Sequence, residues 1–331
     1  MKISVSSYSY SQLGNSDFER IDLAKEMGFE GIEFAEINPG ENNKIEYAKE
    51  LRAYADEKGV MISNYAIGAD FINRNVDSEI DRLKGEVNIA EILGVKTMRH
   101  DATIGPEAER FSKTGFEKYL PVLAKGCKAV TEYAKTKGIK TSVENHGFYC
   151  QQSDRVKALI NAVNDDNFGW LVDIGNFLCA DEMPLDAVKV GVKHIVYAHV
   201  KDFYFADKSV PTPEGYFDTR DGNHLCGSIL GDGIVPVKEC VELIKNSGYD
   251  GWVTLEYEGR ESPLTAVPKG LEYLKKLVLY QFGSIRNLSD ELGISTRTVY
   301  GWFGNNTIPI QKLELILNKI DIDIDKNKLF I

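Results

Sequence analysis

Residues 137–146 read Lys-Gly-Ile-Lys-Thr-Ser-Val-Glu-Asn-His, and this stretch contains the unit from which the chain is built. An amphipathic segment with helical spacing ends before Gly138, which can adopt the left-handed conformation that commonly closes a helix. An apolar run follows and ends at a polar residue, Glu144. The same change from helix to glycine to strand occurs at Gly28 and Gly59. The repeated unit therefore predicts helices that each lead back into a short β-strand.

Strand-like runs and amphipathic segments alternate from the first residue to about residue 280. We predict eight strands, at residues 2–6, 31–36, 60–67, 96–101, 140–144, 169–173, 195–199 and 252–256. Helices are predicted at residues 17–27, 45–58, 78–93, 116–137, 155–163, 237–247 and 266–279. This order favours the α/β class and a closed (β/α)8 TIM barrel over an open doubly wound sheet. A dinucleotide-binding sheet is further disfavoured because no G-x-G-x-x-G follows the first strand.

The composition is that of a globular protein with an acidic surface. The chain has 331 residues, enough for one large barrel and a small extra module. Its formal net charge of −11 argues against binding to nucleic acid or to anionic membranes. Its five cysteines have no C-x-x-C spacing, which indicates reduced thiols. Neither a signal peptide nor a run of about 20 apolar residues is apparent, so we expect a cytoplasmic protein.

Two segments depart from the alternation. Residues 203–233 follow the seventh strand and are rich in Pro, Gly and Asp, which predicts a long loop that can act as a lid. Residues 281–331 contain two short helical patterns separated by Gly293, with Ser295 as the cap of the second, as in a helix-turn-helix. We therefore predict a barrel at residues 1–280 and a helix-turn-helix-like module at residues 281–331.

Four strands in the second half of the chain end in polar residues that suit a metal ion: Glu144, Asp173, His199 and Glu256. The carboxyl ends of barrel strands meet on one face, where the active sites of TIM barrels lie. Three carboxylates and one imidazole suit Mn²⁺, with Mg²⁺ or Co²⁺ as alternatives. Without a metal, the carboxylates would pair with Lys or Arg at the rim, and the histidine would be a hydrogen-bonded core residue.

The motifs around these residues resemble those of the xylose isomerase-like TIM-barrel superfamily, the sugar isomerases and epimerases. They are Val143-Glu144-Asn145-His146, Val172-Asp173-Ile174-Gly175-Asn176, His199-Val200-Lys201-Asp202 and Leu255-Glu256-Tyr257-Glu258. The resemblance covers roughly residues 1–280 and implies that Glu144, Asp173, His199 and Glu256 bind one Mn²⁺-like ion. It also implies that Glu144 and Glu256 exchange a proton with a carbon next to a carbonyl. A metal on that carbonyl would stabilise the enediolate that results.

The chain differs from the ketose epimerases of this group at two positions. Asn176 stands where those enzymes have a histidine after Asp-x-Gly, and Phe205 stands where they have an arginine. Both differences remove groups that would handle the end of a free ketose. They argue against plain ketose 3-epimerisation.

The motifs are also similar to those of the catalytic subunits of bacterial C-glycoside deglycosidases. This resemblance implies cleavage of 3-oxo-C-glucosides with His146 as the base, and a small β-rich second subunit as partner. A homo-oligomer is the alternative assembly. A keto-sugar isomerase or epimerase stays open as the alternative activity, and His146 can instead be a hydrogen-bonding neighbour of the metal ligands.

Further residues at strand ends or within the motifs can contact a sugar substrate: Glu36, His100, Asn145, Asn176 and Lys201. Lys201 can instead form a salt bridge with Glu256 or Glu258. Aromatic residues can form an apolar wall for an aglycone, although near barrel mouths they more often serve packing: Tyr8, Tyr65, Phe177, Phe203 and Trp252.

Two other functions compete with a sugar enzyme. The appended module suggests a DNA-binding regulator whose barrel senses a sugar. Arg297 is then the best candidate for contacting DNA bases. Residues 281–331 hold six Lys or Arg and six Asp or Glu, which provides little attraction for phosphates. An endonuclease acting at abasic DNA sites would need further histidines for a three-zinc cluster, and the chain has only five.

Overall fold

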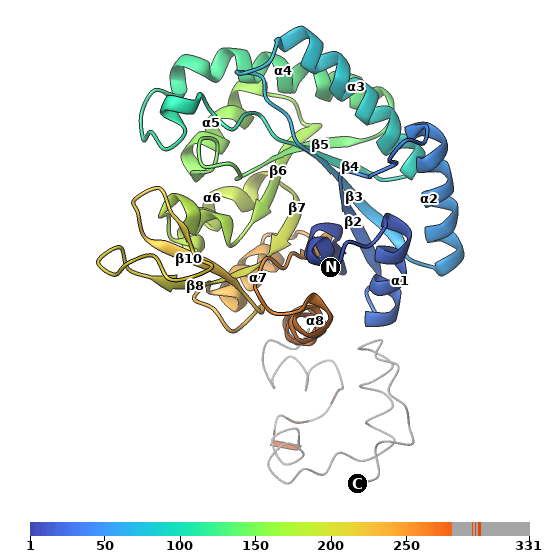
Figure 1. Cartoon of the computed structure of the whole chain (residues 1–331), viewed down its shortest axis with the longest axis vertical. Coiled ribbons are helices and arrows are strands. Elements are labelled where there is room, and N and C mark those ends of the chain that lie inside the picture. Colours follow the sequence, from blue (N-terminus) through green and yellow to red (C-terminus); the bar gives the residue numbers. More distant parts are fainter. Residues whose placement is uncertain (280–292, 294, 296, 299–331) are drawn as a thin grey trace. The chain divides into compact units, whose positions relative to one another are not determined.

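The computed structural model describes residues 1–279 and, beyond them, residues 293, 295, 297 and 298. Eight parallel strands of the described chain close into a barrel in the order β1, β11, β7, β6, β5, β4, β3, β2 (Figure 1). Their bounds are β1 Lys2–Ser6, β2 Gly31–Ala35, β3 Met61–Ile67, β4 Thr97–His100, β5 Lys140–Glu144, β6 Phe168–Asp173, β7 Ile195–Val200 and β11 Trp252–Leu255. The predicted TIM barrel is confirmed, and each strand ends within one residue of its predicted bound.

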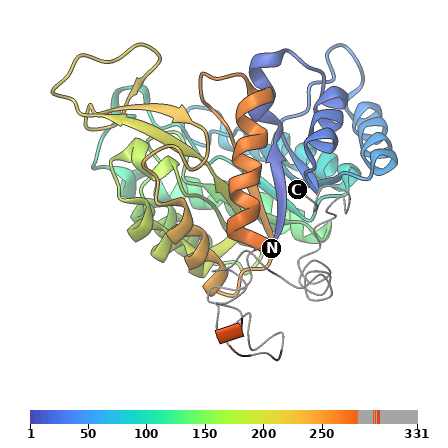
Figure 2. The same cartoon turned by 90° about the horizontal axis from the view of Figure 1, so that it is seen from below.

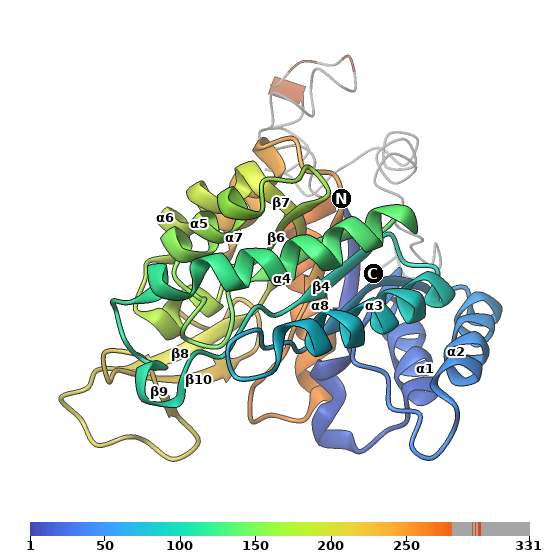
Figure 3. The same ribbon diagram turned by 90° about the horizontal axis from the view of Figure 1, so that it is seen from above.

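Helices cover the outside of the barrel (Figures 1 and 3). They are α1 Asp17–Met27, α2 Lys44–Lys58, α3 Val76–Leu93, α4 Phe116–Thr136, α5 Ser153–Val163, α6 Pro184–Gly191, α7 Val237–Asn246 and α8 Pro263–Leu279. Gly28, Gly59 and Gly94 each adopt the left-handed conformation directly after a helix and donate their N–H groups to carbonyls of its last turn. The predicted glycine pattern therefore marks the ends of α1 and α2 correctly, and Gly94 ends α3 in the same way. Gly138 also has a positive φ, one residue after the Lys137 cap of α4.

Two elements differ from the prediction. The short helix α6, with Pro184 in its first turn, has no counterpart among the predicted helices. In place of a loop without strands, residues 202–228 contain an antiparallel sheet of β8 Asp202–Ala206, β10 His224–Ser228 and β9 Phe217–Asp218 (Figure 2). The connection between β8 and β9 is rich in Pro and Gly and dominates the composition of this segment. The composition therefore predicts a loop and does not reveal the short strands on either side. Its role as a lid stays a prediction.

A layer of hydroxyl groups fills the barrel interior one step below the mouth. Tyr197 Oη lies 2.6 Å from Thr254 Oγ1, 2.7 Å from Ser63 Oγ and 3.2 Å from Ser4 Oγ. All four side chains are buried. Because each hydroxyl can both donate and accept, the layer satisfies its own hydrogen bonds without a charge. It forms an uncharged floor under the polar residues at the mouth.

The chain divides into two compact units, Met1–Leu274 and Lys275–Ile331. The predicted helix-turn-helix lies outside the described residues, apart from residues 293, 295, 297 and 298. Among these, the Thr298 N–H donates to Ser295 Oγ at 3.1 Å. The five cysteines all lie within residues 1–279 and are buried free thiols. Among the helices described, none combines the length and the apolar character needed to span a membrane.

The buried carboxylate of Asp202 ties the β8–β10 sheet to the segment that leads into α7. Asp202 Oδ1 accepts hydrogen bonds from the N–H groups of Phe203 and Val235, both at 2.9 Å. Asp202 Oδ2 accepts from Gly231 at 3.0 Å and Gly233 at 2.9 Å. The Gly-Asp-Gly turn at residues 231–233 is thereby fixed to the start of β8 by a single side chain.

We predict that Asp202→Asn destabilises the barrel by about 2 kcal/mol, because the amide nitrogen cannot accept the backbone hydrogen bonds that a carboxylate oxygen accepts. The measurement is the midpoint of urea unfolding. Asp207→Asn is the matched control, since Asp207 is exposed and accepts one local hydrogen bond from Ser209. Equal midpoints for the two variants would contradict the role given to Asp202.

Candidate metal centre

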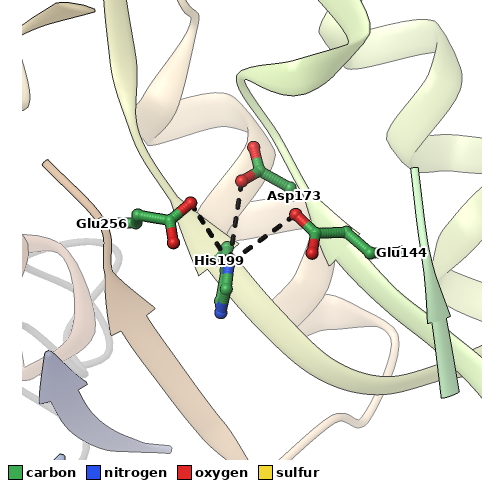
Figure 4. A group of neighbouring side chains, drawn as sticks. All are labelled: Glu144, Asp173, His199 and Glu256. Atoms are coloured by element: carbon green, nitrogen blue, oxygen red, sulfur yellow. Dashed lines mark ion pairs between the residues drawn. The ribbon is translucent and has the colours of Figure 1, made fainter. Parts of the chain in front are cut away.

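Four residues from four neighbouring strands meet at the carboxyl end of the barrel (Figure 4). Glu144 ends β5, Asp173 ends β6, His199 lies in β7 and Glu256 directly follows β11. One ligand atom from each lies within 4.8 Å of all the others. The structure therefore brings together all four metal ligands that the sequence predicts.

The imidazole of His199 faces the three carboxylates. Its Nδ1 lies 3.8 Å from Glu144 Oε1, 3.7 Å from Asp173 Oδ2 and 3.6 Å from Glu256 Oε2. His199 Nδ1 is buried and has no hydrogen-bond partner. Asp173 Oδ2 is also buried and accepts no hydrogen bond, although the ammonium group of Lys201 lies 3.2 Å from it. Buried polar atoms are normally hydrogen-bonded. An unpartnered imidazole nitrogen that faces three carboxylates fits a divalent cation, and the set of one nitrogen and three oxygens suits Mn²⁺, Mg²⁺ or Co²⁺.

Backbone contacts hold Asp173 in place. Asp173 Oδ1 accepts hydrogen bonds from the N–H groups of Gly175 at 2.8 Å and Asn176 at 2.9 Å, which leaves Oδ2 directed toward the centre. Asn145 supports the same strand end, because its Nδ2 donates to the Asp173 carbonyl and its Oδ1 accepts from the Asp173 N–H and from Trp170 Nε1. Asn145 is buried and uses these hydrogen bonds to hold β6, and its predicted contact with substrate stays a prediction.

Glu144 is held at both of its oxygens. Arg99 donates from Nε to Glu144 Oε2 at 2.6 Å, and a second guanidinium nitrogen contacts the same oxygen. Asn176 Nδ2 donates to Glu144 Oε1 at 3.0 Å. Asn176 thus contacts one of the candidate metal ligands, and its predicted contact with substrate stays a prediction. Burial raises the pKa of Glu144 above its usual value, and the positive charges of Arg99 and His199 oppose that rise.

Glu256 and Asp173 share the ammonium group of Lys201. Its Nζ lies 2.6 Å from Glu256 Oε2, 3.2 Å from Asp173 Oδ2 and 3.2 Å from Glu258 Oε1. Burial opposes ionisation of Asp173 and Glu256, but Lys201 and His199 together outweigh it and lower the pKa of both carboxyls. Ser6 Oγ also donates to Glu256 Oε1 at 3.1 Å. The salt bridges foreseen as the alternative role of Lys201 are present, and they place this lysine at the centre itself.

His146 lies in the loop after Glu144 and pairs with an acidic residue of the β4 end. Its Nδ1 is 3.3 Å from Asp101 Oδ1, and Asp101 in turn lies 3.4 Å from an Arg99 nitrogen. Burial disfavours the charged imidazole, but the carboxylates of Asp101 and Glu144 together outweigh it and raise the pKa of His146. The side chain keeps 46% of its surface exposed, unlike the four ligands, whose side chains are at most 11% exposed. His146 is therefore accessible beside the cluster without belonging to it.

The remaining predicted contacts divide into exposed and buried residues. Glu36 has a positive φ of 53° and a side chain that is 59% exposed, with Lys44 Nζ 3.7 Å away. His100 is fully buried near the rings of Phe71 and Phe168, and its Nδ1 contacts the Asp101 carbonyl. The structure therefore does not bring His100 into the cluster, and its surroundings indicate a packing role.

Most of the five aromatic residues have the packing role that the sequence analysis gave as the more common alternative to an apolar wall. Tyr65, Phe177 and Phe203 are buried in the core. Trp252 begins β11 and lies under Lys2 at the opposite end of the barrel. Of the five aromatics, Tyr8 alone has a side chain that is exposed near Glu256 and Glu258.

Three residues of the site are missing from the sequence-based prediction: Glu33, Arg99 and Asp101. Glu33 and Arg99 are charged residues inside short apolar strands, where a charge facing the core needs a partner. Strand alternation places Glu33 on the same face as Gly31 and Ala35. A single charged residue within an apolar strand was therefore the sequence signal that could have identified Glu33 and Arg99 as residues of the site.

Comparisons with known proteins agree with this geometry. The family model described as xylose isomerase-like TIM barrel matches residues 21–277. An inosose dehydratase of Clostridium botulinum is 26% identical over 165 residues, which cover 48% of this chain and 55% of that protein. The match thus spans about half the length of that relative.

Other similar proteins are aligned over more of their length. An L-ribulose-5-phosphate 3-epimerase of Escherichia coli is 24% identical over 283 residues, which cover 79% of this chain and 90% of the epimerase. The crystal structure of a 3-keto-D-glucoside 4-epimerase from E. coli superposes with a TM-score of 0.62 at 16% identity, covering 83% of this chain and 99% of that one. Likeness at this level of identity supports the fold of the barrel.

We predict that Asp173→Asn lowers the affinity for Mn²⁺ by about 100-fold or more, since even residues that only support metal ligands contribute about 10–100-fold. Isothermal titration of the metal-free protein with Mn²⁺ measures the change. Asp186→Asn, at an exposed position of α6, is the control and should bind as the unaltered protein does. Equal affinity in both variants would mean that the ion, if bound, lies elsewhere.

Proposed function

The chain is an enzyme of the xylose isomerase-like TIM-barrel family, and on that premise we propose that it removes a proton from the carbon next to a carbonyl of a keto-sugar or oxidised glycoside. Glu144, Asp173, His199 and Glu256 would hold a divalent metal, most consistent with Mn²⁺. A bound dication would polarise the substrate carbonyl and stabilise the negative charge that develops on its oxygen. The surrounding side chains then supply orientation and the base.

The names of similar proteins support this class of chemistry. An epimerase acting at carbon 3 of a 2-ketose and a dehydratase acting on a keto-compound can both begin with loss of a proton next to the carbonyl. A 3-keto-D-glucoside 4-epimerase also acts beside the keto group of an oxidised glucoside. The shared requirement is a base close to a polarised carbonyl.

The three candidate bases, Glu144, Glu256 and His146, have different surroundings, and this difference indicates which of them takes the proton. Both oxygens of Glu144 already accept hydrogen bonds from Arg99 and Asn176. Glu256 is paired with Lys201 and Ser6. His146 remains half exposed, and Asp101 can orient its ring and stabilise the positive charge that it gains on taking a proton. We therefore assign the base to His146, with Glu144 and Glu256 mainly as metal ligands.

One accessible base suits elimination better than epimerisation, which needs a group on each face of the carbon. The best candidate reaction is C–C bond cleavage of a 3-oxo-C-glucoside. His146 takes the proton from C2, the C–H electrons form the C1=C2 double bond, and the C1–aglycone bond breaks. The aglycone leaves with that electron pair and gains a proton. The sugar product keeps its 3-oxo group.

A keto-sugar isomerase or epimerase is the second candidate. It is favoured by the presence of Glu144 and Glu256 on separate strands around one centre, since epimerases of this kind use two carboxylates. Asn176 and Phe205 argue against it: Asn176 is engaged with Glu144, and Phe205 is an exposed residue of β8. The DNA-binding regulator rests on residues outside the described part of the chain. Within residues 1–279 a single metal-binding cluster is present, which also disfavours the three-zinc endonuclease.

A partner subunit, or a second copy of the chain, would find exposed apolar side chains on the β8–β10 sheet. Phe205 in β8, Phe217 in β9 and Val210 in the connection between these strands are each more than one third exposed. These residues support the assembly that the resemblance to deglycosidases implies. The surface does not itself distinguish a small second subunit from a homo-oligomer.

We predict that His146→Ala lowers kcat by about 10²–10⁴-fold on 3-oxo-C-glucosides, the range expected for loss of a general base. Mn²⁺ affinity should stay unchanged, because His146 does not belong to the four ligands. His194→Ala, at the amino-terminal end of β7, is the matched control. Release of the aglycone at the normal rate by the His146 variant would remove this histidine from the mechanism.

Deuterium labelling separates the two candidate reactions. We predict that the Mn²⁺-loaded protein in D₂O releases the aglycone of a 3-oxo-C-glucoside, measured by chromatography, and leaves free ketoses without deuterium, measured by mass spectrometry. An epimerase would return deuterium to the carbon that it deprotonates. A deuterated ketose epimer without aglycone release would therefore reject the elimination in favour of the second candidate.

A further inference from the structure

We infer that Glu33 is a positioning residue of the metal centre, which fixes the ring of His199 so that Nδ1 presents its lone pair to the cation. The inference rests on the proposed metal site. It assigns a role to a buried acidic residue of β2 that comes from the opposite half of the chain.

The contact between the two side chains crosses the barrel interior. His199 Nε2 lies 2.9 Å from Glu33 Oε1 and 3.0 Å from Glu33 Oε2. The other ring nitrogen, Nδ1, points to the three carboxylates, so the two nitrogens of the ring face different partners (Figure 4). The ring of His199 is thereby held from both sides.

The chemistry of the two groups assigns the proton. An ionised carboxylate can only accept a hydrogen bond, so the nitrogen that faces Glu33 must carry the hydrogen. The imidazole that binds a metal is neutral and has one N–H, which leaves Nδ1 as the nitrogen with the free lone pair. Metal-binding histidines commonly donate their other N–H to a carboxylate, which fixes the ring and strengthens the nitrogen as a ligand.

The surroundings of Glu33 give its carboxylate few other partners. Glu33 is fully buried, and within the described residues its hydrogen-bonding contacts are His199 and Asn64, whose Nδ2 donates to Oε2 at 2.8 Å. A buried carboxylate is costly unless a positive charge or hydrogen bonds compensate it. Asn64 fixes the orientation of Glu33, and the imidazole with its cation supplies the compensating charge.

Glu33→Gln tests the inference by metal affinity, independently of activity. We expect Mn²⁺ affinity, measured by isothermal titration, to fall by about 10–100-fold, as for other residues that support a metal ligand. Glu36→Gln is the matched control three residues further on, since the Glu36 side chain is 59% exposed and should leave affinity unchanged. A folded Glu33→Gln protein, judged by circular dichroism, that binds Mn²⁺ as tightly as the control would overturn the inference.

A second measurement uses the unaltered full-length protein and does not depend on how well the variant folds. With ¹⁵N-labelled histidine and Zn²⁺ as a diamagnetic probe, long-range ¹H–¹⁵N spectra should show His199 protonated at Nε2 and bound to the ion through Nδ1. Binding through Nε2 would overturn the role of Glu33 while leaving the metal site intact. Failure of the unaltered protein to bind Zn²⁺ or Mn²⁺ would instead overturn the metal site and this inference together.

Discussion

The mutual repulsion of three buried carboxylates is the constraint around which the mouth of this barrel is organised. Glu144 and Asp173 are at most 2% exposed, and Glu256 approaches the same imidazole nitrogen as they do. Negative charges this close disfavour one another strongly where water is excluded. Arg99 and Lys201 each offset part of the charge at one side of the cluster. A dication at the centre would offset the rest, and the fold holds the donor atoms where such an ion would bind.

The order of the strands around the barrel brings the residues of this cluster together. β5, β6, β7 and β11 are consecutive around the barrel, so residues at their carboxyl ends are neighbours although they lie 112 positions apart in the chain, from 144 to 256. The hydroxyl layer below is uncharged, which confines the charged groups to the mouth. The same arrangement also gives the possible bases at the mouth of the barrel different surroundings. Glu144 is bound by a guanidinium and an amide, whereas the accessible imidazole of His146 stands beside it with its own carboxylate, and this inequality is what favours one base over two.

Much of the fold and the inner ring of the site could be predicted because both depend on local patterns. Alternating apolar runs ending in Glu144, Asp173, His199 and Glu256 specify the strands and their ends, and parallel strands in a barrel bring those ends together. The supporting residues could not be found this way. Glu33 reaches His199 from 166 positions away, and its role depends on which strands face each other across the barrel. The burial of Tyr65 and Phe177 and the occupied amide of Asn145 likewise follow from tertiary packing, which periodicity does not reveal.

The central claim, that these four side chains form one cation site, is tested most directly by anomalous scattering from crystals grown with Mn²⁺. The account predicts a single strong peak at the mouth of the barrel, within about 2–2.5 Å of His199 Nδ1 and of an oxygen from each of Glu144, Asp173 and Glu256. An empty cluster in such crystals, or Mn²⁺ bound only at other residues, would contradict the metal centre and the chemistry proposed for it.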